Sequence, residues 1–297
     1  MTSSNRLVFF GTEQFSVPTL KSLLEAGYEV VSIVTKPDAR KGRGNKLFIH
    51  PIKQIGLDNS IPVLQPNKLS EIEQQLLSLQ ANAAVLVSYG KIIPQNIISI
   101  FEPIGIINIH PSQLPKYRGP SPIEAAILAG DTSTAVSIMK LDSGMDTGPI
   151  FTQQAIALSD HETKLELSDK LANIGAKLLI ETLPDILTGQ LKPTPQPKNN
   201  DVSVTTLMSK HDGVLDIATE EAIVLERKIR AYQIYPKTHL NLFGNDVIVT
   251  SAEVVQANEN DSLVIPCANK TFLKIKTLIA PSGRSMSGSD FLRGYLR

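Results

Sequence analysis

Residues 105–150 read GIINIHPSQLPKYRGPSPIEAAILAGDTSTAVSIMKLDSGMDTGPI, and this stretch predicts a strand that presents polar side chains beside a stiff loop. GIINIH is apolar and β-branched, as is typical of a buried strand, and Pro111 ends it because proline removes a ladder donor. Side chains alternate along a strand, so Asn108 and His110 share one face. We expect a helix over SPIEAAILAG, a strand over AVSIMKLD, and a turn holding Asp146 between two glycines. These polar residues are therefore expected to converge at two neighbouring strand ends.

The chain before this stretch alternates between strand and helix patterns. Buried strands are predicted for RLVFF at 6–10, EVVSIVT at 29–35 and AAVLVSYG at 83–90. Continuous apolar strands of this kind belong to parallel sheets that are covered on both faces. The sequence therefore predicts an α/β fold with a doubly wound, mainly parallel, Rossmann-like sheet. Only Gly11 follows the first strand, so the three-glycine dinucleotide fingerprint is missing and NAD binding is disfavoured.

The last third of the chain has a different pattern. GQLKPTPQPKNND is rich in proline and lacks apolar periodicity, which is a linker composition. THLNLFG, DVIVTSAEVV, SLVIPCA and TFLKIKTLIAP are short segments bounded by turn residues, as in a small antiparallel β-barrel. We predict a first domain at 1–189, a linker at 190–206 and an OB-like second domain at 207–297.

Composition excludes several classes of protein. Lys plus Arg equals Asp plus Glu at 29 each, so no global charge attracts nucleic acid or a membrane. Cys267 is the only cysteine, which excludes an intramolecular disulfide and fits a reducing compartment. No apolar run approaches the roughly 18 residues needed to span a bilayer. We expect a cytoplasmic protein without membrane contact.

One local charge run is an exception to this balance. KPDARKGRGNKLFIHP, which begins at residue 36, holds five Lys or Arg against one Asp, and its glycines disfavour a helix. We expect a mobile basic loop at 36–46 that contacts an anionic partner. The alternative is a run that is merely solvated.

Asn108, His110 and Asp146 suggest direct group transfer to an external nucleophile. The chain has no GxSxG elbow, and Cys267 has no associated catalytic motif, so a covalent acyl-enzyme is unsupported. An amide N–H and an imidazole can stabilise an oxyanion, while a carboxylate orients the imidazole and moves a proton. Asp142 and Asp146 lack the spacing of a calcium loop and His110 has no helical His partner, so no metal site is predicted. A purely structural, hydrogen-bonded His110 remains the alternative.

Segments along nearly the whole chain resemble the folate-dependent formyltransferase family. They are FFGTEQFS, TKPDARKGRGNKL, LVSYGKIIP, NIHPSQLPKYRGPSPI, LDSGMDTG, IRAYQIYP and SGRSMSGSDFL, in the family's order. The resemblance implies a formyltransferase domain followed by an OB-like, tRNA-binding domain. It implies transfer of a formyl group from 10-formyltetrahydrofolate to the amino group of methionine on initiator methionyl-tRNA, for translation initiation. It implies no metal, and we expect a monomer.

The resemblance also assigns roles to particular residues. It implies that Asn108, His110 and Asp146 are catalytic. The residues expected to contact folate lie in two loops and are Ser112, Gln113, Leu114, Pro115, Tyr89 and Gly90. The residues expected to contact tRNA lie in the basic loop and are Arg43, which matches the family position at the acceptor end, with Lys36, Arg40, Lys41 and Lys46.

Two other functions remain open on the sequence. The first domain would equally suit a folate-dependent formyltransferase or deformylase that acts on a small-molecule amine. The chain could also be a non-catalytic RNA-binding protein, which would explain the second domain but not the grouping of Asn108, His110 and Asp146. Charge is nearly balanced over 207–297, so an RNA role for that region rests on the resemblance.

Overall fold

The structure is a computed structural model that describes residues 6–41, 46–198, 201–256 and 262–295. The chain divides into two compact units, each of which draws on several segments. Unit 1 comprises residues 1–120, 134–156 and 168–204, and unit 2 comprises 121–133, 157–167 and 205–297.

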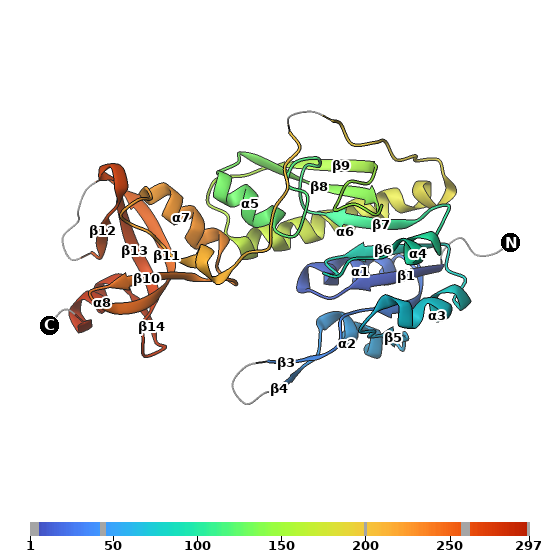
Figure 1. Cartoon of the computed structure of the whole chain (residues 1–297), viewed down its shortest axis with the longest axis horizontal. Coiled ribbons are helices and arrows are strands. Elements are labelled where there is room, and N and C mark those ends of the chain that lie inside the picture. Colours follow the sequence, from blue (N-terminus) through green and yellow to red (C-terminus); the bar gives the residue numbers. More distant parts are fainter. Residues whose placement is uncertain (1–5, 42–45, 199–200, 257–261, 296–297) are drawn as a thin grey trace. The chain divides into compact units, whose positions relative to one another are not determined.

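Unit 1 is built on a sheet with strand order β5-β2-β1-β6-β7-β8-β9 (Figure 1). The strands are β1 (Arg6–Gly11), β2 (Glu29–Val34), β5 (Val63–Leu64), β6 (Ala83–Val87), β7 (Ile106–His110), β8 (Ser133–Lys140) and β9 (Ile150–Ala157). Neighbouring strands from β5 to β7 are parallel, and β8 is antiparallel to β7. The chain passes outward from β1 to β5 and returns beside β1 with β6, so the topological switch point lies between β1 and β6. The predicted doubly wound, mainly parallel sheet is confirmed.

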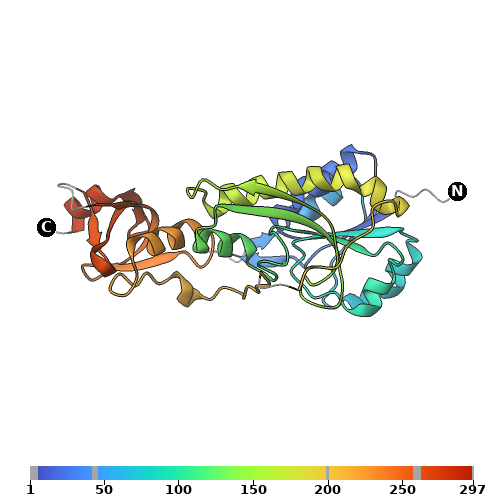
Figure 2. The same ribbon diagram turned by 90° about the horizontal axis from the view of Figure 1, so that it is seen from above.

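Helices cover both faces of this sheet (Figure 2). They are α1 (Val17–Glu25), α2 (Pro51–Asp58), α3 (Glu73–Ser78), α4 (Gln95–Ser99) and the long α6 (Lys164–Thr188). Gly175 of α6 lies directly against Ile109 and Val136, and a Cβ there would lie 2.7 Å from an Ile109 methyl carbon. On the opposite face, Phe10 packs with α3 and α4 in one apolar cluster. Because Ile109 faces α6, its neighbours Asn108 and His110 face the other side, as the alternation predicts.

The basic segment after β2 corrects one expectation. Strand β3 (Ala39–Lys41) pairs antiparallel with β4 (Lys46–Phe48), so these described residues form strands where the sequence predicted a mobile basic loop at 36–46. Residues 42–45 lie outside the described residues.

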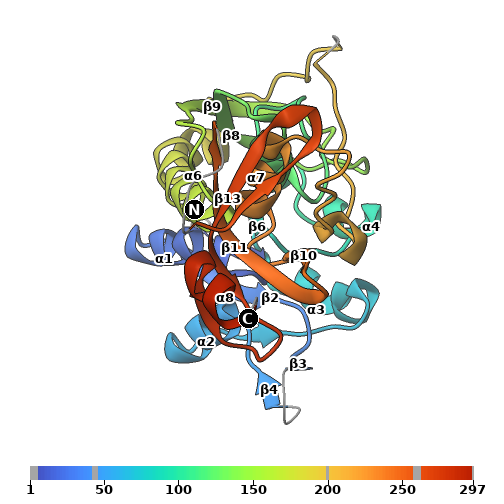
Figure 3. The same ribbon diagram turned by 90° about the vertical axis from the view of Figure 1, so that its left-hand side faces the viewer.

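Unit 2 contains an antiparallel sheet in which β10, β11, β13 and β12 are neighbours in that order and β14 also pairs with β13. Its strands are β10 (Thr238–Leu242), β11 (Asn245–Val255), β12 (Val264–Pro266), β13 (Phe272–Ile279) and β14 (Ser285–Ser287). Helices α7 (Ala222–Ala231) and α8 (Gly288–Tyr295) lie beside this sheet (Figure 3). The apolar core contains Leu225 and Ile229 of α7 and Phe291 of α8. The curled sheet confirms the predicted OB-like antiparallel β fold.

The remaining helices are short. Helix α5 (Pro122–Ala129) belongs to unit 2 and ends at Gly130, whose φ of 65° is the left-handed cap that the sequence predicts. The 3-10 helices are η1 (Gln14–Ser16), η2 (Leu69–Ile72), η3 (Lys210–Gly213) and η4 (Ala268–Lys270).

Candidate active site

The carboxyl end of β7 carries the first two predicted catalytic residues. Asn108 and His110 are each only 4% exposed. Asp146 joins them from the loop between β8 and β9. Because β8 is antiparallel to β7 and pairs Lys140 with Ile107, the carboxyl end of β8 lies beside the start of β7. The three residues converge, and Asp146 lies in the segment where the sequence predicted a turn, but the strand before it ends beside the start of β7 and not beside its carboxyl end as expected.

The carboxylate of Asp146 lies between the other two side chains. Its Oδ2 is 3.6 Å from Nδ1 of His110 and accepts a hydrogen bond of 2.8 Å from the backbone N–H of Gly119. Its Oδ1 is 3.5 Å from Nδ2 of Asn108. Oδ2 is therefore anchored, whereas Oδ1 has only a long contact.

His110 is held from both sides of its ring. Nε2 lies 2.9 Å from the carbonyl oxygen of Tyr117, while Nδ1 faces Asp146. A carbonyl oxygen can only accept, so Nε2 carries a proton in this arrangement. Both ring nitrogens thus face oxygen atoms, which hold the plane of the ring in place.

The backbone around this group is sharply turned. Asp146 has a φ of 51°, Tyr117 a φ of 58° and Gly119 a φ of 101°. Positive φ values are uncommon for residues other than glycine and often occur at functional sites. Gly119 supplies the backbone donor to Asp146 from a conformation that glycine adopts without strain.

The segment predicted to contact folate, residues 112–115, is held by side-chain hydrogen bonds to its backbone carbonyl oxygens. Ser137 Oγ donates to the carbonyl oxygen of Ser112 at 2.6 Å, and Gln153 Nε2 donates to that of Leu114 at 2.9 Å. The side chains of Ser112 and Leu114 and the ring of Pro115 are buried, whereas Gln113 is exposed. This segment forms a rigid wall that follows the carboxyl end of β7.

Tyr89 is buried and Gly90 is exposed, although the two residues are adjacent in sequence. The Tyr89 ring is 1% exposed and packs edge-on against Phe10 in the apolar core, so burial raises the pKa of its hydroxyl to about 12. Its carbonyl oxygen accepts a hydrogen bond from Thr12 Oγ1, which links the loops after β1 and β6. Gly90 is exposed and has a φ of 69°. Gly90 thus lies at the surface of the switch point, and the Tyr89 side chain lies inside.

The structure describes some, but not all, of the basic residues predicted to contact tRNA. The Lys36 backbone N–H donates to Thr12 Oγ1 at 3.3 Å, and its ammonium lies so close to Gly90 that a Cβ there would clash with it. Arg40 and Lys41 lie on β3, and Lys46 begins β4. Arg43 lies outside the described residues.

The sequence reasoning missed the segment that follows α6. Gln196 donates to the carbonyl oxygens of Asp146 and Gly148 at 2.7 and 2.8 Å, and its Oε1 accepts two hydrogen bonds from Arg118. A lone glutamine in a proline-rich segment gives no sequence signal for such a contact. Gly119, by contrast, could have been identified from the RGP turn.

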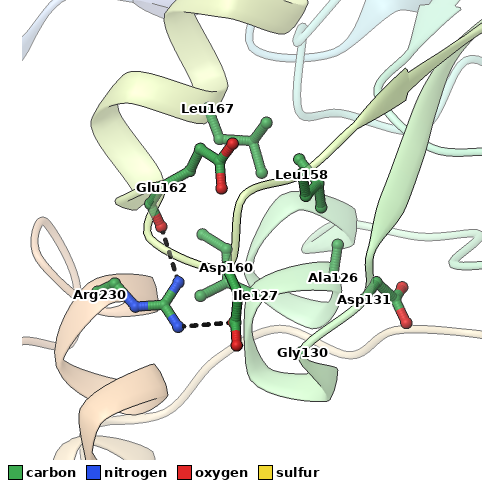
Figure 4. A pocket seen from close by; sticks show the side chains of 9 residues that line it. All are labelled: Ala126, Ile127, Gly130, Asp131, Leu158, Asp160, Glu162, Leu167 and Arg230. Carbon is green, nitrogen blue, oxygen red and sulfur yellow. Dashed lines mark hydrogen bonds and ion pairs between the residues drawn. The ribbon is translucent and has the colours of Figure 1, made fainter. Parts of the chain in front are cut away.

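A hollow in unit 2 is lined by charged and apolar side chains (Figure 4). Its lining residues are Ala126, Ile127, Gly130, Asp131, Leu158, Asp160, Glu162, Leu167 and Arg230. The guanidinium of Arg230 contacts Asp160, Glu226 and the carbonyl oxygen of Glu162 at 3.1, 2.7 and 3.0 Å. Burial opposes its charge, but the bonds to Glu226 and Asp160 outweigh burial and raise the pKa of Arg230 above its usual value. Each nitrogen of the Arg230 guanidinium is therefore engaged within the protein, and Arg230 is a structural ion-pair partner.

In the part of the chain that the structure describes, no helix is both long and apolar enough to cross a membrane. No group of three His, Cys, Asp or Glu side chains in the described ranges is arranged to hold a metal ion.

Known proteins are similar to this chain over its whole length. Residues 5–183 match the family described as "Formyl transferase", and residues 207–296 match "Formyl transferase, C-terminal domain". The methionyl-tRNA formyltransferase of Myxococcus xanthus (strain DK1622) is 37% identical over 305 aligned positions, which cover 99% of this chain and 96% of that protein.

Solved structures share the fold. An N-formyltransferase from Helicobacter canadensis, in complex with folinic acid and dTDP-3-aminofucose, has a TM-score of 0.69 at 16% identity and covers 91% of this chain and 98% of its own. The phosphoribosylglycinamide formyltransferase of Bacillus halodurans has a TM-score of 0.52 at 27% identity, covering 62% of this chain and 96% of its own.

Proposed function

The chain belongs to the formyl transferase family, and we propose that it formylates the amino group of methionine on initiator methionyl-tRNA, with 10-formyltetrahydrofolate as donor. The observation that carries the proposal is the similarity to a methionyl-tRNA formyltransferase across 99% of the chain, second unit included. A small-molecule formyltransferase is the alternative. It has less support, because the phosphoribosylglycinamide formyltransferase of Bacillus halodurans matches only 62% of this chain. We place the activity in the cytoplasm, where translation begins.

We place the chemistry at Asn108, His110 and Asp146. The methionine amine attacks the formyl carbon, a carbon–nitrogen bond forms, and the carbonyl oxygen becomes an oxyanion. Asn108 Nδ2 has a second N–H beyond the one directed at Asp146 and can donate to that oxyanion. His110 joins it by exchanging the carbonyl of Tyr117 for the oxyanion, since catalytic hydrogen bonds often rearrange when substrates bind.

We assign the transfer of the amine proton to Asp146. Its Oδ2 is occupied by Gly119 and faces His110, so Oδ1 is the oxygen that can accept the proton of the attacking amine. The bond between the formyl carbon and the donor nitrogen N10 then breaks, and the proton passes to N10. The Nε2–H of His110 stabilises the oxyanion by a hydrogen bond, and the imidazole itself neither gains nor loses a proton.

The donor would lie between the wall formed by Ser112, Gln113, Leu114 and Pro115 and the loop at Gly90, next to the switch point where open α/β sheets bind ligands. The buried Tyr89 ring would support that loop from within. The co-substrate 10-formyltetrahydrofolate supplies the activated formyl group, and the chain supplies orientation and stabilisation of the oxyanion.

The acceptor end of the tRNA would reach the site past the basic segment that contains strands β3 and β4. Among the described residues, the Lys36 ammonium has no hydrogen-bond or ion-pair partner, and it lies against Gly90 at the switch point. A free ammonium there can bind a phosphate near the 3′ end, and Arg40, Lys41, Arg43 and Lys46 would extend the contact along the backbone. Residues 207–297 would hold a more distant part of the tRNA.

An acceptor competition tests the proposal. Purified protein and formyl-labelled 10-formyltetrahydrofolate are offered methionyl-tRNA, deacylated tRNA, a nucleotide-linked amino sugar and glycinamide ribonucleotide together. We expect label on methionyl-tRNA alone. Label on either small amine, with none on methionyl-tRNA, would make the small-molecule formyltransferase the correct assignment.

A further inference from the structure

Asp146 is anchored at both its side chain and its backbone, and the two anchors are joined. Gly119 holds its Oδ2 through the backbone N–H, at 2.8 Å. Gln196 holds its backbone carbonyl oxygen through Nε2, at 2.7 Å. Arg118, next to Gly119, donates through Nε and Nη2 to Oε1 of Gln196 at 3.0 and 2.7 Å. These contacts form a closed ring around the carboxylate.

The Gln196 side chain uses its full hydrogen-bonding capacity in this ring. Its amide nitrogen donates both protons, to Asp146 and Gly148, and its oxygen accepts from the Arg118 guanidinium. The residue is 8% exposed, so these bonds are shielded from competing water. Such geometry fixes a turn in which Asp146 has a φ of 51°, a conformation that its surroundings must maintain.

The segment that carries Gln196 is itself fastened to the same loops. Thr194 and Ile150 exchange backbone hydrogen bonds of 2.8 Å in both directions. Ser203 Oγ accepts from the Tyr117 N–H at 2.8 Å, and the Ser203 carbonyl oxygen accepts from the Arg118 N–H at 2.9 Å. The segment has linker composition, yet its described residues are bound to the turns that shape the site.

From this geometry we infer that Gln196 is a positioning residue that sets the place of the Asp146 carboxylate for proton transfer. The inference rests on the proposed function, and it adds a residue that touches neither substrate nor the reacting atoms. Without the two amide donors, the turn at Asp146 is free to relax and Oδ1 moves away from the attacking amine. A misplacement of about 1 Å at a reacting group lowers turnover by roughly 10²-fold.

The test is a set of steady-state measurements on the full chain with methionyl-tRNA and 10-formyltetrahydrofolate. Gln196→Ala should lower kcat by roughly 10- to 100-fold while KM for each substrate stays within about twofold. Gln196→Glu keeps an acceptor for Arg118 but turns a second oxygen toward two carbonyl oxygens, so it should be as slow as Gln196→Ala. Thr194→Val, which removes a side-chain bond of 3.3 Å to Ile150 in the same segment, is the matched control and should keep wild-type kcat.

A double-mutant cycle separates positioning from general loosening of the fold. In the Asp146→Asn background, Gln196→Ala should cause little further loss of kcat, because the group on which Gln196 acts has already been changed. Full additivity, a wild-type kcat for Gln196→Ala, or an equal loss in Thr194→Val would overturn the inference. Absence of formyl transfer in the wild-type chain would instead refute the proposed function, so the two failures are distinguishable.

Discussion

Replacing Asp146 by Asn changes the charge of the proposed proton acceptor and little else. Asn is one of the few residues that tolerate positive φ, so the backbone at φ 51° can be retained. The amide oxygen can still accept from Gly119, which directs the new NH₂ group toward Asn108 and leaves no acceptor for the amine proton. The variant therefore isolates the chemical role of the carboxylate.

The magnitude follows from the role of Asp146 as the proton acceptor. A positioned general base contributes typically about 10²- to 10⁴-fold to turnover. Oδ1 has only a 3.5 Å contact, to Nδ2 of Asn108, so this oxygen is available to the attacking amine. We expect a loss of kcat between roughly 10²- and 10³-fold, the lower part of that range, because the Asp146 side chain is 17% exposed and water can partly replace it as the proton acceptor.

The assay is formyl transfer to methionyl-tRNA at saturating donor, with calorimetric binding of a stable folate analogue to each protein as the control. Binding should be unchanged at one site per chain, because Asp146 contributes to the transition state and not to folate affinity. A variant that binds the analogue normally and keeps kcat within threefold of wild type would refute the proton-transfer role.

Three further predictions concern the substrate and the fold. Lys36→Gln should lower kcat/KM for methionyl-tRNA by roughly tenfold without changing folate binding, since it removes one phosphate contact; a normal kcat/KM would exclude that contact. Arg43→Ala should weaken tRNA use similarly and reduce its salt dependence, as measured by kinetics from 50 to 200 mM salt. Glu166 accepts hydrogen bonds from Thr163, which lower the pKa of Glu166, so this cap stabilises α6 above the ordinary carboxyl pKa and is lost as pH falls through the lowered value. The difference in Tm between wild type and Glu166→Gln, which removes the titrating group, should therefore shrink below about pH 4.

The sequence was sufficient where local pattern and tertiary environment agree. Continuous apolar runs identified β1, β2, β6 and β7 because both faces of those strands are buried. Thr163 and Glu166 match the capping-box pattern that marks the start of a helix, and the hydrogen bonds of that cap are present at the start of α6. Alternation along β7 placed Asn108 and His110 on one face for the same local reason.

The sequence was insufficient where long-range contacts decide the structure. Strand β9 was not predicted, because IFTQQAIA has polar residues at its centre and gains its order by lying beside β8. Nothing in LDSGMDTG indicates that β8 runs antiparallel to β7, which is why the expectation that the three residues meet at two neighbouring strand ends was wrong. Gln196 lies 50 residues from Asp146 in sequence, and no spacing rule relates the two.

The most direct test of the proposed function is a single-turnover experiment in which enzyme preloaded with 10-formyltetrahydrofolate is mixed with limiting initiator methionyl-tRNA. The wild-type chain should convert the methionyl-tRNA to formylmethionyl-tRNA in one exponential phase. Asn108→Ala and His110→Ala should each slow that phase by roughly 10²-fold or more while the donor remains bound, since each removes an oxyanion donor. No formylmethionyl-tRNA from the wild-type chain, or wild-type rates in both variants, would contradict the account.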